Sequence, residues 1–218
     1  MKQKIIKAIS RFFSYFPKCK LCYPFYLASR LYFKKEDFVY DALPDELNDF
    51  KICYASDIHF GSMLRKDRAL KLVEHINELK ADLVLLGGDF GEDAEEGARF
   101  FNVIPTIRAK HGVFACIGNH DLIGDKSYIK SLIEEASQKN IRFIVNEKIK
   151  LEGLPLFLSS CDDIKKGRPK FDYLKEENEG FHIFFPHSPD VFPEILNKAF
   201  NSENKKLFDL SLAGHTHA

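Results

Sequence analysis

Six short apolar runs in this chain are each followed at once by polar residues, and this recurrence restricts the folds open to it. The runs occupy residues 51–56, 82–86, 113–117, 154–159, 181–185 and 207–213. Short apolar runs bounded by Gly or Pro are typical of buried β-strands. In an open α/β sheet the ligand crevice lies beyond the carboxyl ends of the strands, so separate strands can direct side chains to one place.

The polar residues after five of these runs have the chemistry of metal ligands. They are Asp57, His59, Asp89, Asn119, His120, Asp121, His187, His215 and His217, whereas the run over 154–159 leads only to Cys161, Asp162 and Asp163. A carboxylate such as that of Asp89 can bridge two cations about 3.5–4 Å apart. Oxygen and imidazole donors without thiolate suit Mn, Fe, Zn or Co, and they disfavour a structural zinc or an iron–sulfur cluster. The remaining histidines, His75, His111 and His182, are interpreted as structural or solvent-facing.

Segments with helical periodicity lie between the predicted strands. They cover residues 66–80, 126–139 and 189–200, where apolar residues recur among Lys, Glu and Asp. Alternation of strands and helices predicts an α/β layered fold. A chain of 218 residues with 45% hydrophobic and 29% charged residues fits one globular catalytic domain.

The ordered motifs resemble those of the calcineurin-like metallophosphoesterases. These motifs are Asp57-x-His59, Gly88-Asp89, Gly118-Asn119-His120-Asp121, His187 and Gly214-His215-x-His217, and the match runs from about Lys51 to the end of the chain. The stretch over residues 185–190, Phe-Pro-His-Ser-Pro-Asp, resembles the His-x-Pro-Asp signature of a membrane-associated bacterial branch that includes UDP-2,3-diacylglucosamine pyrophosphatases. The resemblance implies a layered sandwich of two β-sheets flanked by helices.

The same resemblance implies a site with two divalent metal ions. One ion would be held by Asp57, His59, Asp89 and His217, and the second by Asp89, Asn119, His187 and His215. His120 would contact a phosphate oxygen of the substrate and help to protonate the leaving group, with Asp121 as its orienting partner. A metal-bridging hydroxide would attack phosphorus in line and hydrolyse a phosphodiester or pyrophosphate bond.

The first 35 residues differ from the rest in charge. They contain seven Lys and two Arg without an acidic residue, so the remainder of this formally neutral chain is net negative. In a helical projection of residues 2–16, Ile and Phe fall on one face and Lys4, Lys7 and Arg11 on the other. Such a helix would lie in the interface of an anionic membrane. A nucleic-acid-binding arm would not need the apolar stripe, so nucleic acid is a disfavoured partner. The alternative to membrane binding is that the stripe packs on the catalytic domain.

Several features predict a peripheral protein on the cytoplasmic face of a membrane. The longest uncharged stretch, residues 21–29, is far shorter than the ~20 residues needed to span a bilayer, and no cleavable signal pattern is found. The five cysteines indicate a reducing compartment: Cys19 and Cys22 lack a second close pair for zinc, Cys53 and Cys116 lie in predicted strands, and Cys161 is isolated. No protein partner is inferred.

The expected organisation is therefore a basic amphipathic segment over 1–35 and a metallophosphoesterase domain over 36–218. Family members usually continue for several tens of residues after the last His-x-His, so this domain is expected to be C-terminally truncated. The expected function is metal-dependent hydrolysis of a lipid-linked phosphodiester or pyrophosphate. Two alternatives stay open: a soluble phosphodiesterase that acts on nucleotides or small diesters, and a non-catalytic binding scaffold on the same fold.

Overall fold

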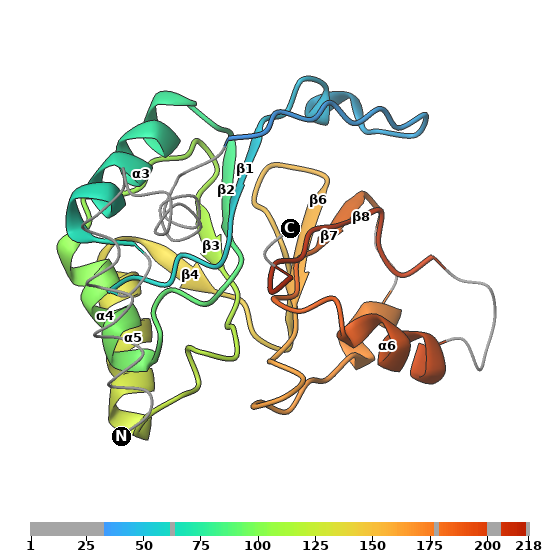
Figure 1. The fold of residues 1–218 in the computed structure, drawn as a ribbon. Coiled ribbons are helices and arrows are strands. Elements are labelled where there is room, and N and C mark those ends of the chain that lie inside the picture. The colour runs from blue at the N-terminus through green and yellow to red at the C-terminus, as the bar shows by residue number, and fades with distance from the viewer. Residues whose placement is uncertain (1–32, 62–63, 177–178, 200–205, 217–218) are drawn as a thin grey trace, which may run out of the picture.

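In the computed structural model, two four-stranded β-sheets face each other and helices cover their outer faces (Figure 1). The structure describes residues 33–61, 64–176, 179–199 and 206–216. Nearly all of the basic segment predicted over 1–35 lies outside these ranges, and so does His217. The predicted α/β architecture is confirmed.

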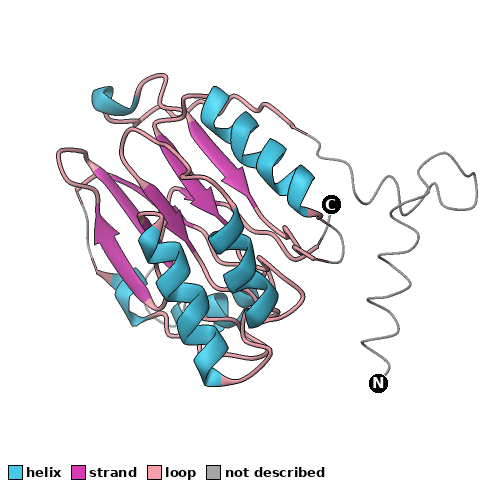
Figure 2. Cartoon of the chain, turned by 90° about the vertical axis from the view of Figure 1, so that its left-hand side faces the viewer, coloured by secondary structure: helices cyan, strands magenta, loops and turns pink. Residues whose placement is uncertain are grey.

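The first sheet is parallel, and its strand order follows the chain. Its strands are β1 (Ile52–Ala55), β2 (Leu83–Leu86), β3 (Val113–Ala115) and β4 (Ile141–Phe143). The connecting helices are α3 (Lys66–Glu78), α4 (Ala94–Val103) and α5 (Lys126–Gln138). Right-handed crossovers that always advance in one direction place every helix on one face of the sheet. Figure 2, viewed from the helix side, shows these helices over the strands. The other face is thereby left for the second sheet.

Strand β2 shows how the first sheet joins two cores. Its four residues have no exposed surface. Val84 and Leu86 pack with the helices, whereas Leu83 and Leu85 pack with Leu158 and other residues of the second sheet. Because successive side chains of a strand point to opposite faces, a run that is apolar throughout is what a strand buried on both sides requires.

The second sheet combines one antiparallel strand with three parallel ones. Its strands are β5 (Glu147–Lys150), β6 (Leu156–Ser160), β7 (Phe181–Phe184) and β8 (Leu210–Ser211), and β5 is the antiparallel member. Helix α6 (Val191–Ala199) and the 3₁₀-turn η3 (Asp172–Lys175) contribute to a third core cluster with Phe184. A second 3₁₀-turn, η2 (Asp45–Leu47), contributes Leu47 to the core between the sheets.

The helices predicted from periodicity are present: α3 and α5 begin at the predicted residue, and the other helix ends lie one to two residues inside the predicted bounds. Periodicity did not reveal α4, β4 or β5. Helix α4 has an apolar face but is short and contains Gly97, a poor helix former, whereas β4 and β5 are short strands that carry charged residues and lack an apolar run. The run over 207–213 forms only the two-residue strand β8. Within the described ranges, no helix combines the length and apolarity needed to cross a bilayer.

Candidate metal centre

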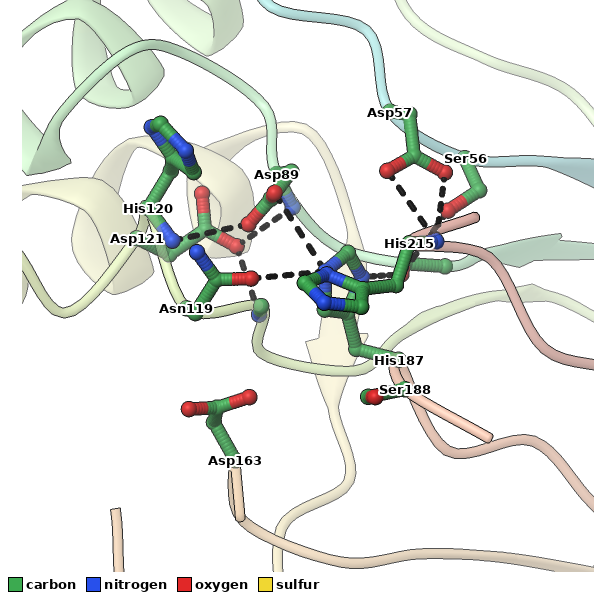
Figure 3. A network of polar contacts seen from close by, with 12 residues as sticks. Ser56, Asp57, Asp89, Asn119, His120, Asp121, Asp163, His187, Ser188 and His215 are labelled. Carbon is green, nitrogen blue, oxygen red and sulfur yellow. Dashed lines mark hydrogen bonds and ion pairs between the residues drawn. The ribbon is translucent and has the colours of Figure 1, made fainter. Parts of the chain in front are cut away.

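Side chains that follow five parallel strands meet at one edge of the two sheets. Asp57 follows β1, Asp89 follows β2 and Asn119 follows β3, while His187 and His215 follow β7 and β8. Figure 3 shows these residues in one network of polar contacts, with Asp89 between residues of the first sheet and His187 of the second. The predicted convergence at the strand ends is thus seen for every described candidate ligand.

Four of the candidate ligands have a left-handed backbone conformation that non-glycine residues rarely adopt. Their φ angles are 55° at Asp57, 45° at His59, 55° at Asp89 and 69° at His215. Such angles persist where surrounding contacts hold them, and they concentrate at functional sites. Here the amide of Asp57 donates to Gly88 O at 3.1 Å and the amide of His59 donates to Asp89 O at 3.0 Å.

The carboxylate of Asp89 lies at the middle of the centre and is only 1% exposed. Its Oδ2 is 3.3 Å from Nε2 of His187 and 3.8 Å from Nε2 of His59, and its Oδ1 accepts a hydrogen bond from the amide of His120 at 2.8 Å. A side chain at Gly118 would not fit, because its Cβ would lie 2.2 Å from Asp89 Oδ1. One carboxylate therefore contacts imidazoles from both sheets.

Among the described residues the potential donor atoms form three groups: His59, Glu92 and His120 make up one, and the other two share Asp89. Of the two that share Asp89, one contains Asp57, His59 and Asp89, and the other contains Asp89, His187 and His215; in each, the atoms lie within 4.8 Å of one another. Asn119 joins the latter group, since its Oδ1 is 3.2 Å from Nε2 of His187. Carboxylate, amide and imidazole donors in this arrangement fit divalent ions. The remaining predicted ligand, His217, lies outside the described residues.

Burial and charge act in opposite directions on these imidazoles. Burial alone would lower the pKa of His187, but the hydrogen bond and charge of Asp89 outweigh it and raise the pKa to about 9. At His59, burial also acts to lower the pKa, but the hydrogen bond and charge of Glu92 act to raise it, and the net shift of the His59 pKa is upward. At His215, burial and the neighbouring Lys165 lower the pKa. A metal ion that binds His187 has to displace a proton, because only the neutral ring ligates.

The expectation that Asp121 orients the ring of His120 is corrected by the structure. Asp121 is fully buried, and its Oδ2 accepts hydrogen bonds from the amides of Asp89 and Gly118, both at 2.8 Å. Its Oδ1 accepts another from the amide of Phe90 at 2.9 Å. Burial and the charge of Asp89 raise the pKa of Asp121 to about 7, against the effect of these amides. Asp121 therefore holds the turn that carries Asp89.

The His120 ring makes polar contacts with Glu92, a residue that the sequence reasoning missed. Nδ1 of His120 is 3.0 Å from the carbonyl oxygen of Glu92 and 4.0 Å from its carboxylate. The same carboxylate is 3.2 Å from Nδ1 of His59. Because Glu92 stands only three residues after Asp89, its place in the same loop was the one sequence signal available.

The other histidines lie outside these donor groups. His182 is buried and contacts Ser159 Oγ at 2.7 Å and Leu207 O at 2.8 Å, while His75 and His111 stack on Phe33 and Phe50. Cys116 and Cys161 are buried thiols whose pKa values are raised by burial. Cys19 and Cys22 lie outside the described residues.

Comparison with known proteins extends this picture to sequence relatives. The sequence profile described as "Calcineurin-like phosphoesterase" matches residues 50–218. An uncharacterized metallophosphoesterase of Helicobacter pylori is 31% identical over 84% of this chain and 48% of its own length. The uncharacterized metallophosphoesterase YkuE of Bacillus subtilis is 27% identical over 80% of this chain and 60% of its own length. A "Transmembrane protein with metallophosphoesterase domain" of Danio rerio is 24% identical over 82% of this chain and 42% of its own length. The chain thus spans about half the length of the curated relatives it matches.

Proposed function

This chain belongs to the calcineurin-like phosphoesterase family, and from that premise we propose that it hydrolyses a phosphodiester or pyrophosphate bond with two divalent metal ions. The observation that carries the proposal is the Asp89 carboxylate, which two groups of oxygen and nitrogen donors share. A shared carboxylate is the arrangement that a pair of close cations requires.

The proposed ligands divide between the two sheets. Asp57, His59 and Asp89 would hold one ion, with His217 as the fourth ligand inferred from the sequence, and Asp89, Asn119, His187 and His215 would hold the other. When bound, ions of the Mn, Fe, Zn or Co type would lower the pKa of a water molecule and neutralise charge on phosphate oxygens. Every expected ligand within the described ranges is present, which disfavours the non-catalytic scaffold.

His120 is the group proposed to move a proton. A carbonyl oxygen can only accept, so the 3.0 Å contact with Glu92 O places a proton on Nδ1 of His120. The other nitrogen, Nε2, is then the atom that donates a proton to the departing oxygen when the ring is charged. The Glu92 carboxylate lies 4.0 Å from the same Nδ1.

The test replaces the shared carboxylate. Asp89→Ala should remove most bound metal, measured by elemental analysis after dialysis, and abolish hydrolysis of bis-p-nitrophenyl phosphate with added Mn. Asp125→Ala is the matched control, because Asp125 is exposed at the start of α5 and its side chain makes no capping hydrogen bond there. Near-normal metal content and turnover in Asp89→Ala would overturn the two-metal proposal.

A lipid-linked substrate is the specific form of this function that we favour. It is supported by the nine cations and the Ile and Phe stripe near the N-terminus, and by the resemblance of residues 185–190 to the diacylglucosamine pyrophosphatase branch. The Danio rerio relative is named as a transmembrane protein, which associates this domain with membranes in that protein. Hydrolysis of nucleotide-linked lipids and of small soluble diesters, compared in one panel, distinguishes this function from a soluble phosphodiesterase.

A further inference from the structure

We propose that Lys165 binds an anionic oxygen of the phosphate substrate beside His215. The proposal rests on the proposed function and adds a substrate-binding residue to its site. It comes from the loop after β6, whose Asp162 and Asp163 follow a strand end but belong to neither group of candidate metal ligands.

Two aspartates fix the turn that carries Lys165. The buried Asp163 accepts hydrogen bonds at its Oδ1 from the amides of Lys165 at 2.9 Å and Lys166 at 2.7 Å. Asp162 accepts one from the amide of Asp163 at 2.8 Å. A Cβ at Gly167 would lie 2.1 Å from Asp162 Oδ1, so the turn closes tightly over that carboxylate. The backbone of Lys165 is therefore held in one place beside the centre.

The end of the Lys165 side chain reaches the candidate metal ligand His215. Its Nζ lies 2.9 Å from Nε2 of His215 and 3.0 Å from Oδ2 of Asp190. The Lys165 side chain is 52% exposed, so its ammonium group stands between the imidazole and solvent. Anything that approaches His215 from solvent on this side meets a positive charge.

Charge balance indicates what that ammonium group binds during the reaction. Divalent ions at the centre would repel the ammonium group of Lys165 beside His215. The only opposing charge that it contacts there, among the residues that the structure describes, is the half-exposed carboxylate of Asp190. A phosphate that reaches the ions brings negative oxygens to the same place. An ammonium group suits this task because its three donors on a flexible stem adapt to a tetrahedral anion, while the fixed turn keeps the charge nearby.

The neighbouring residue provides a matched control. Lys166 lies on the same turn, and its amide also donates to Asp163. Its side chain is exposed, and within the described part of the chain it makes no ion pair with the centre. Lys165 and Lys166 thus share local backbone and charge, and they differ in the contact with His215.

The experiment compares Lys165→Met, Lys165→Arg and Lys166→Met in the full chain loaded with Mn. Loss of one charge-assisted hydrogen bond to phosphate should raise the Kd of inorganic phosphate, measured by calorimetry, and the KM for bis-p-nitrophenyl phosphate by about tenfold in Lys165→Met. Metal content should stay normal, kcat should change less than KM, and Lys165→Arg should recover most of the binding. Lys166→Met should resemble the unaltered chain.

A second substrate locates the contact. A nucleoside diphosphate sugar carries a negative charge on each of two phosphates. A larger rise in KM for this substrate than for the diester assigns Lys165 to the phosphate next to the scissile one, and an equal rise assigns it to the scissile phosphate.

The proposal is overturned if phosphate Kd and KM are unchanged in Lys165→Met, if Lys166→Met shows the same defect, or if Lys165→Met loses metal. Absence of all hydrolysis in the unaltered, metal-loaded chain would refute the proposed function instead. In that case the phosphate Kd of the same variants still decides whether Lys165 binds phosphate.

Discussion

His120 and Asp121 are adjacent in sequence but have different tasks in the structure. The ring of His120 is partly exposed and held by Glu92, whereas the carboxylate of Asp121 faces inward to three backbone amides. Substitution of each residue should therefore affect a different property, one chemical and the other structural.

Replacement of His120 should slow the reaction without emptying the centre. General acid catalysis contributes about 10²- to 10⁴-fold, so His120→Asn should lower kcat by that order while bound metal stays near normal. The defect should shrink for substrates with a very good leaving group, which hardly needs a proton. His111→Asn, which alters a ring stacked on Phe50, serves as the control. Parallel loss of metal and activity would identify His120 as a ligand instead.

Replacement of Asp121 should weaken the fold around Asp89. An Asn side chain offers one oxygen where the carboxylate has two, so its NH₂ group would face a backbone donor and leave a buried amide unpaired. We expect Asp121→Asn to lower the free energy of unfolding by about 1–3 kcal/mol, measured by urea denaturation. Asp125→Asn, at an exposed position, should leave the midpoint of urea unfolding equal, within error, to that of the unaltered chain. An unchanged midpoint in Asp121→Asn would contradict the structural role.

His182, a residue of β7, links the second sheet to the segment before β8. The His182 ring bonds to Ser159 on β6 and to Leu207, and its backbone amide donates to Asp209 at 2.7 Å. Burial lowers the pKa of this ring to about 4 from 6.5, with Lys148 acting in the same direction. The second sheet thus depends on a histidine that stays neutral.

This histidine should make stability depend on acidity. As the pH falls below 6.5, the unfolded chain takes up the proton first, so the stabilisation is complete above pH 6.5 and is lost between pH 6.5 and about 4. The loss amounts to about 3 kcal/mol. His182→Gln should be less stable at pH 7 but should flatten the fall relative to the unaltered chain, as measured by urea denaturation at each pH. An equal slope in both proteins, with His75→Gln as control, would refute this origin.

The layers of helices and strands follow from the order and the hand of the connections between parallel strands. Each connection of the first sheet advances by one strand, so all three helices lie on one face and the second sheet covers the other. The parallel strands of both sheets then end at the same edge, where Asp57 and His215 come into contact although 158 residues separate them. The centre is therefore a consequence of how the two sheets are stacked.

The molecule's proposed place at a membrane depends on residues that the structure does not describe. Deletion of residues 2–32 should release the protein from anionic liposomes in co-sedimentation, and hydrolysis of a small soluble diester should stay largely intact. A variant with Ile6→Ser and Phe13→Ser keeps every cation and should also bind less, because the apolar face supplies part of the affinity. An insoluble or unfolded deletion variant would show instead that this stripe packs on the domain.

The sequence alone determined the α/β class, the positions of the main strands and helices, and the identity of the candidate ligands. These features are local: an apolar run marks a buried strand, and Asp, Asn or His directly after it lies at the strand's end. The family resemblance added the pairing of these ligands into two groups, and the described donors lie together in that way.

Only the tertiary structure decided which groups these side chains contact. Asp121 binds amides up to 32 residues away, and Lys165 meets His215 across 50 residues. Such contacts depend on strand order, on the distance between the sheets and on which turn is held rigid, and none of these is encoded in a local pattern. A carboxylate next to His120 in the sequence therefore turned inward to the backbone, and Glu92 from the neighbouring loop contacts the ring.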